Sequence, residues 1–158
     1  MSKFLEHTHL VDPYPVTVAA SLADMFAGEP SSDVINMENA KSAVFIIKTA
    51  GGTGSASIQI VCVDAITAAT TTTALSFNYK TITTPDTQGA TTESKTLVVA
   101  GTDNIYAIEV DAAKLAEVGY SYIRLTATEK VAKPLSGTIT AFLMGLRSAE
   151  DVTPTQLV

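Results

Sequence analysis

The sequence predicts an all-β protein, a β-sandwich or jelly roll of seven to eight strands with one short helix and extended terminal arms. Three observations predict this fold class: runs of β-branched and aromatic residues, alternation of apolar and polar residues within several runs, and turn residues at short intervals between them. A chain of 158 residues is long enough for one domain with its own core. We expect residues 1 to 32 to be an N-terminal arm, residues 33 to 147 the sandwich and residues 148 to 158 a C-terminal tail.

The N-terminal segment lacks the alternation of a strand. It contains Pro13 and Pro15, and the run VTVAASLADMFAG that follows is compatible with a short helix ending at Gly28. Strand signals dominate only from residue 33 onward, which sets the predicted start of the sandwich.

The first strong strand signals are SAVFIIKT (Ser42 to Thr49) and SASIQIVCV (Ser55 to Val63). The glycine-rich turn AGGTG separates them, so this region predicts a β-hairpin. In LSFNYKT, the period of two places Leu75, Phe77 and Tyr79 on one face, toward a core.

The second half of the sandwich contains further strands and the predicted helix. In NIYAIEVD, alternation puts Tyr106, Ile108 and Val110 on one side. Asp111 is a suitable N-cap for the short helix DAAKLAEVG, which Gly119 ends. The segments GYSYIRLTATEK and SGTITAFLMGLR then predict the last two strands of a sheet. The predicted interior includes Ile46, Ile58, Phe77, Tyr106, Ile108 and Leu143.

Threonine is frequent in and around these strands, as in ATTTTALSF and NYKTITT. Its β-branched side chain suits the pleated backbone, and its hydroxyl keeps a solvent-facing position polar without the repulsion between stacked like charges. The long polar loop from Thr83 to Ser94 is expected either to project from the sandwich or to order against a partner.

The residue types that perform chemistry are sparse. The two histidines, His7 and His9, both lie in the arm, so no histidine of the sandwich can activate a nucleophile or build a preorganised metal site. Cys62, the single cysteine, lies in the apolar run IQIVCVD and is predicted to be a buried apolar residue. We therefore expect no enzyme activity, no catalytic residues, no cofactor and no bound metal.

The charge distribution bears on partners. The net charge of −6 argues against nucleic-acid binding, which needs clustered lysine and arginine. Residues 1 to 32 carry a net charge of −3 and residues 148 to 158 of −2, so most of the excess lies at the ends. No apolar run reaches the roughly 18 residues of a membrane span, and the start MSKFLEHTHL lacks the order of a signal peptide, so we expect no membrane partner and synthesis in a cytoplasm.

The order of parts resembles small virion proteins of tailed bacteriophages, especially capsid decoration (cement, head-stabilising) proteins. The resemblance lies in VFIIKTAGGTGSASIQIVCVDA, LSFNYKTITT and IYAIEVDAAKLAEVGYSYIRLTATE, followed by a hydrophobic strand and a short polar tail. It implies a non-enzymatic protein that is made in the host cytoplasm, binds the outside of the phage head at subunit junctions and stabilises it. The implied partners are the major capsid protein and further copies of the chain, a homotrimer being favoured.

Two alternatives remain open at this point. One is a head-to-tail or tail structural protein of the same virion class. The other is a carbohydrate-binding β-sandwich module, which would more often expose tryptophans, and this chain has none.

The arm offers candidate partner-binding residues, the apolar Phe4, Leu5, Leu10 and Val11. Burying all four would contribute roughly 6 to 12 kcal/mol, whereas ordering some twelve residues of backbone costs on the order of 12 to 24 kcal/mol. We therefore expect the arm not to fold back stably on its own domain and to become ordered on a partner.

Overall fold

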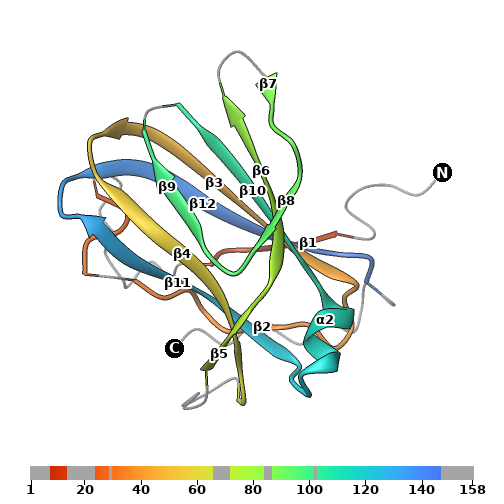
Figure 1. Cartoon of the computed structure of the whole chain (residues 1–158). Helices are drawn as coiled ribbons and strands as arrows, with labels where there is room; N and C mark the ends of the chain where they lie inside the picture. Colours follow the sequence, from red (N-terminus) through yellow and green to blue (C-terminus); the bar gives the residue numbers. More distant parts are fainter. Residues whose placement is uncertain are drawn as a thin grey trace.

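The structure, a computed structural model, describes residues 8–13, 24–28, 30–65, 72–83, 87–101 and 103–146. It is an all-β sandwich of two antiparallel sheets, which confirms the predicted fold class (Figure 1). The seven-stranded sheet has the order β1-β12-β3-β10-β6-β7, with β8 also paired to β6. Its strands are β1 (Thr8–Val11), β3 (Ser42–Gly52), β6 (Phe77–Thr83), β7 (Thr87–Gln88), β8 (Thr92–Ser94), β10 (Ile105–Asp111) and β12 (Leu135–Met144).

The five-stranded sheet has the order β2-β11-β4-β5, with β9 also paired to β4. Its strands are β2 (Ile35–Asn36), β4 (Ser55–Val63), β5 (Thr72–Leu75), β9 (Leu97–Ala100) and β11 (Tyr122–Val131). The described part thus contains twelve strands rather than seven to eight. One reason is that LSFNYKT is not one strand: it breaks at Ser76, where the chain passes from β5 in one sheet to β6 in the other.

The predicted hairpin of β3 and β4 is wrong. β3 pairs with β10 and β12, whereas β4 pairs with β11, β5 and β9 in the other sheet. The predicted last two strands, β11 and β12, likewise lie in different sheets. The turns after β3 and after β11 are therefore corners between the two layers. β3 forms seven register pairs with β10 and ten with β12, and these long-range ladders decide its place in the sheet.

The two corners lie against each other. The backbone N–H of Gly54 donates to the carbonyl oxygen of Pro134 over 3.3 Å. A Cβ atom on Gly52 would lie 2.0 Å from the Pro134 oxygen, and one on Gly54 would lie 2.0 Å from the Lys133 oxygen. Gly52 also has a φ of +121°, which L side chains rarely adopt. Glycine is therefore required at both positions of this corner.

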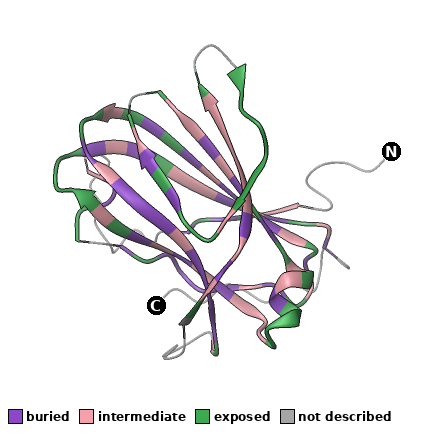
Figure 2. Cartoon of the chain, in the orientation of Figure 1, coloured by how far each residue is buried: buried purple, intermediate pink, exposed green. Residues whose placement is uncertain are grey.

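The core fills the space between the sheets, and buried and exposed residues alternate along the strands (Figure 2). Five of the six predicted interior residues are buried: Ile58, Phe77, Tyr106, Ile108 and Leu143. The sixth prediction, Ile46, is wrong, because in β3 the buried positions are Ala43, Phe45, Ile47 and Thr49. Ile46 has the opposite parity and points out of the sandwich.

The predicted helix is present as α2 (Ala112–Glu117). The side chain of Asp111 accepts a hydrogen bond from the backbone N–H of Ala113 over 2.8 Å, and Leu115 is buried. Gly119 follows the helix with a φ of +79°, as expected for a glycine stop. In the described part of the chain, no helix is long and apolar enough to cross a membrane.

Two strands, β7 and β8, lie within the segment from Thr83 to Ser94, whose described residues are exposed except for Ser94. Its described residues pair with β6 of the same chain through β7 and β8, and the N–H of Gly89 donates to the Thr81 carbonyl over 2.8 Å. The segment thereby forms the edge of the seven-stranded sheet.

Part of the predicted arm also belongs to the sandwich. β1 pairs with β12 over four register positions, and Val11 lies in the core at 3% exposure. Met25 and Phe26 are buried as well, while most of the predicted short helix lies outside the described residues. For residues 8 to 11, the expectation that the arm does not fold back on its own domain is therefore wrong. The open edge of β12 supplies the strand hydrogen bonds that the estimate left out.

A buried polar cluster fixes the turn between β9 and β10. The hydroxyl of Tyr106 donates to the Ala100 carbonyl over 2.7 Å and accepts from the Ala100 N–H over 3.2 Å. The hydroxyl of Thr49, which is fully buried, donates to the Asn104 carbonyl and accepts from the Asn104 N–H. This threonine holds a turn and does not face solvent.

Replacing Tyr106 by Phe is expected to lower the free energy of unfolding by about 1 to 2 kcal/mol, because the substitution removes three hydrogen bonds, two with the Ala100 backbone and one from the Asn104 side-chain amide, and leaves the Ala100 N–H without this acceptor. Chemical denaturation measures the change. The matched control is Tyr79→Phe, whose hydroxyl makes no hydrogen bond with other described residues, so its effect should stay within about 0.5 kcal/mol. Equal effects of the two substitutions would contradict the role of the Tyr106 hydroxyl.

Candidate functional site

The best candidate for a functional site is the outer face of the seven-stranded sheet, the face turned away from the core. Its residues alternate along each strand with the buried ones and are aligned across the sheet by the strand registers. The outer face consists of Thr8, Leu10, Ser42, Val44, Ile46, Lys48, Asn78, Lys80, Ile82, Glu93, Ile105, Ala107, Glu109, Asp111, Thr138, Thr140, Phe142 and Met144.

This outer face is rich in apolar side chains. Leu10 is 62% exposed and Met144 is 38% exposed. The other apolar residues on the face are half-buried: Val44, Ile46, Ile82, Ile105, Ala107 and Phe142. In an antiparallel sheet with one face in water, outward positions are usually polar. A face this apolar is therefore typical of a surface that contacts another molecule.

The apolar residues form a continuous band. The register places Leu10 beside Phe142 and Phe142 beside Val44, so β1, β12 and β3 contribute neighbouring side chains. Ile46 is the next outward residue of β3, and Ala107 of β10 is paired with it. Around the small Ala107 side chain the face has a shallow hollow of about 330 Å³, bordered among others by Val44, Lys80, Glu109 and Met144.

Charged residues lie beside this band. Glu109 and Asp111 mark one end of the face along the strands, and Lys48 and Lys80 lie toward the other end. Among the described residues, one ion pair occurs, between Lys114 in α2 and Glu93 in β8. The hydrogen bond from Lys114 is the main reason that the pKa of the Glu93 carboxyl is lowered.

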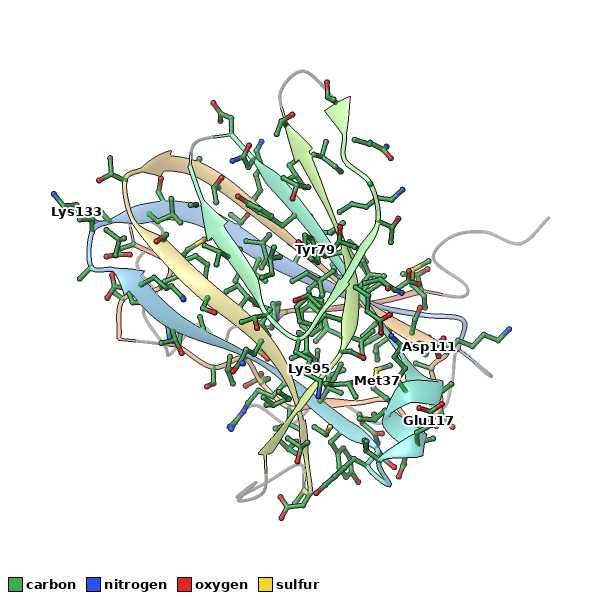
Figure 3. All side chains as sticks on the ribbon, viewed as in Figure 1. Met37, Tyr79, Lys95, Asp111, Glu117 and Lys133 are labelled. Carbon is green, nitrogen blue, oxygen red and sulfur yellow. The ribbon has the colours of Figure 1, made fainter. Side chains whose placement is uncertain are left out.

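A second hollow, of about 700 Å³, lies beside α2. Its lining includes Met37, Glu38, Lys41, Asp111 and Tyr120, and Figure 3 labels Met37 and Asp111 near the helix. The carboxylate of Asp111 already caps the helix. The lining brings carboxylates, one lysine and the hydroxyls of Ser42 and Ser121 together, but among the described residues no hydrogen bond joins either hydroxyl to a carboxylate that could act as its base.

No group of three or more histidine, cysteine, aspartate or glutamate side chains that could hold a metal occurs within the described ranges. His9 lies in β1, whereas His7 is outside these ranges. Cys62 is buried, as predicted from its apolar run, and burial raises the pKa of its thiol. The Cys62 thiol donates to the Thr73 carbonyl over 3.3 Å, so it is a packed side chain of β4 and not a reactive one.

The four predicted partner-binding residues do not form one site. Leu10 is the most exposed of the large apolar residues in the described part and lies on the outer face. Val11 points to the opposite side and is buried in the core. Phe4 and Leu5 lie outside the described residues.

Most of the outer face was not predicted from the sequence. The signal was present in β3 and β12, whose runs AVFII and AFLM are apolar at both parities. A strand that is apolar on both sides is either covered on both sides or presents a contact surface. These runs were interpreted only as strand signals, so the contact surface was not predicted from them.

Comparisons with known proteins find little. Neither the protein-family models nor the curated proteins contain a match. Among the solved structures, the chain is similar to that titled "Crystal structure of SPBc2 prophage-derived protein YomS", with a TM-score of 0.46 and 12% sequence identity over 90% of this chain and 97% of that one. A match at this score and identity does not indicate a function.

Proposed function

We propose that the chain is a non-enzymatic structural protein of a tailed-bacteriophage particle, and that it is a capsid decoration protein which binds the outside of the head at subunit junctions. The observation that carries the proposal is the apolar outer face of the seven-stranded sheet, with Leu10 and Met144 exposed upon it, because a particle protein needs such a face to contact a neighbouring subunit, whether of the shell or another copy of the chain. The sequence resemblance to decoration proteins supports the choice of assembly.

The shape of the outer face favours a protein as the bound molecule. Small-molecule sites are concave and enclose most of their ligand, whereas this surface is a sheet face whose central hollow is shallow and whose larger hollow lies at its edge beside α2. Its composition, an apolar centre with charged residues around it, is that of a protein–protein contact. A structural role requires such contact surfaces and no catalytic groups.

A head-to-tail or tail protein would need the same kind of surface, so the position in the particle decides between the two roles. Cryo-electron microscopy of particles of the phage that encodes the chain is the test, with particles from a strain in which the gene is deleted as the control. We expect density that disappears on deletion and recurs at many symmetry-related positions on the head. Density at a single vertex would replace decoration by a neck or tail role, and its absence from the particle would contradict both.

The deletion strain also provides a measurement of stability. Heads that lack the protein are expected to release their DNA at a lower temperature than complete heads, because a protein bound across subunit junctions adds contacts that must break before the shell opens. A dye that fluoresces on free DNA reports the release temperature. Equal release temperatures would contradict stabilisation.

A further inference from the structure

We propose that the outer face pairs with the outer face of a second copy of this chain, related to the first by a two-fold axis that lies in the contact plane and runs across the strands. The inference rests on the part of the proposed function that treats this face as a protein-contact surface. The pair forms without the capsid shell, and other surfaces of the pair would contact the shell.

The charge pattern of the outer face favours a second copy of the chain as the partner. Following the strands, Asp111 comes first, then Glu109, then Lys80 in register with Ala107, and last Lys48 in register with Ile105. The face is therefore acidic at one end and basic at the other. Lys48, Lys80 and Glu109 form no ion pair with the residues that the structure describes. These charges are available to a partner of the opposite pattern.

A second copy has that opposite pattern when it is turned around. In a two-fold contact, if one residue of the first copy touches a given residue of the second, then the same two residues also touch with the copies exchanged. A two-fold axis parallel to the strands would bring acidic end against acidic end. An axis across the strands reverses the order, so that the acidic end of each copy lies over the basic end of the other.

The register then assigns the contacts, with the axis passing between the level of Glu109 and that of Lys80. Lys80 comes opposite Asn78 of the second copy, which the registers place between Glu109 and Glu93. Lys48 comes opposite Ser42 of the second copy, beside Asp111. Glu93 is already paired with Lys114, so the carboxylate available to Lys80 is that of Glu109 and the one available to Lys48 is that of Asp111, and each contact occurs twice. Complementary charges of this kind fix the orientation of a complex more than they add affinity.

The apolar band supplies the centre of the same contact. With this axis, Val44 of one copy comes opposite Ile46 of the other, since both are outward residues of β3 on either side of the axis. Sheets packed face to face lie about 10 Å apart, close enough for such side chains to interdigitate. The hollow beside Lys80 and Glu109 leaves room for the stem of the incoming Lys80.

The size of the face is sufficient. Its six strands span five spacings of about 4.8 Å, and its outward residues span at most three steps of about 6.8 Å, which limits the area to roughly 500 Å² for each copy. The pair would bury at most about 1,000 Å² in total, the size of a weak or transient protein contact. Weak contacts have dissociation constants in the micromolar range, and we expect a value on the order of 10 µM. The resemblance to decoration proteins predicts a trimer, whereas this face predicts a dimer.

The first test is sedimentation equilibrium of the purified full chain over a range of about 1 to 200 µM, chosen around that expected constant. We expect a monomer–dimer equilibrium that Val44→Asp abolishes, because a carboxylate would be buried in the centre of the contact. The matched control is Val98→Asp in β9 of the other sheet, at a valine that is 52% exposed, which should leave the dimer intact. A wild-type chain that stays monomeric, a trimer, or equal effects of the two variants would overturn the proposal.

The second test uses the charges and does not depend on the folding of a core variant. Lys80→Glu and Glu109→Lys should each weaken the dimer by roughly tenfold or more, because each places like charges together. An equimolar mixture of the two variants should restore association, since both contacts of the mixed pair then join opposite charges. The thermal midpoint of each variant alone is the control for folding. Failure of the mixture to restore association would overturn the orientation across the strands.

These outcomes are separate from those of the proposed function. A monomer in solution that still occupies many positions on the head would overturn the dimer and leave decoration in place. A dimer that is absent from the particle would do the reverse.

Discussion

Replacing Gly54 by alanine is expected to destabilise the protein by at least about 3 kcal/mol, or to prevent folding. The new Cβ would lie 2.0 Å from the carbonyl oxygen of Lys133 and 3.2 Å from the Cβ of Leu135. The first contact is to backbone, so no side chain can rotate to relieve it. Two corners between the sheets meet here, and separating them would break the hydrogen bond from Gly54 to Pro134. Chemical denaturation with circular dichroism measures the loss.

The control for this substitution is Gly119→Ala, after α2. Among the residues described, no heavy atom lies within 4 Å of the Cβ position there, although the φ of +79° is unfavourable for alanine. Its cost should therefore be that of the backbone conformation alone, about 1 to 2 kcal/mol. If the two variants were equally stable, the close approach of the corners would not be a constraint on the fold.

Replacing Phe77 by alanine is expected to lower the free energy of unfolding by about 3 to 5 kcal/mol, the cost of a large cavity in a packed core. The side chain of Phe77 is fully buried, and its ring packs edge-on against Tyr79 with centroids 6.3 Å apart. Because Phe77 is the first residue of β6, directly after the chain has changed sheets, the cavity would open where the two layers are joined.

The comparison for Phe77 is Phe142→Ala. Phe142 lies on the outer face and is only half-buried, so truncation removes less packing there and should cost clearly less stability. The expected order of thermal midpoints is wild type, then Phe142→Ala, then Phe77→Ala. A reversed order would mean that the two faces of the sheet have been assigned the wrong way round.

The inner residues of single strands could be predicted from the sequence wherever alternation was unambiguous. In β10, the charged Glu109 must face outward, which places Tyr106 and Ile108 on the inner face of the strand. Both are buried as predicted. The helix α2 was predictable for a similar reason, because Asp111 and Gly119 mark its two ends by local chemistry.

The assignment of strands to sheets could not be predicted in the same way. A glycine turn between two β-rich runs occurs both in a hairpin and in a corner between layers, and only the distant partners distinguish them. β3 is held by β12 from the far end of the sequence and by β10, so local turn signals do not decide its pairing. The parity of Ile46 was misjudged because β3 is apolar on both sides.

The candidate site was predicted only at Leu10. For the arm, the free energy of apolar burial was compared with the entropy cost of ordering the backbone, without hydrogen bonds to the chain's own sheet. The hydrogen bonds between β1 and β12 favour folding of residues 8 to 11. The rest of the outer face is built from five further strands that come together only in the folded sheet.

The position of β12 has a consequence for the order of folding. This strand comes last among those described, yet it lies between β1 and β3, two of the earliest. During synthesis from the N-terminus, both strands remain without their neighbour on that side until residues 135 to 144 are available. Closing such long loops is slow. The sheet is therefore expected to form late and in one cooperative step, and a chain truncated before β12 should expose two unpaired edges and aggregate.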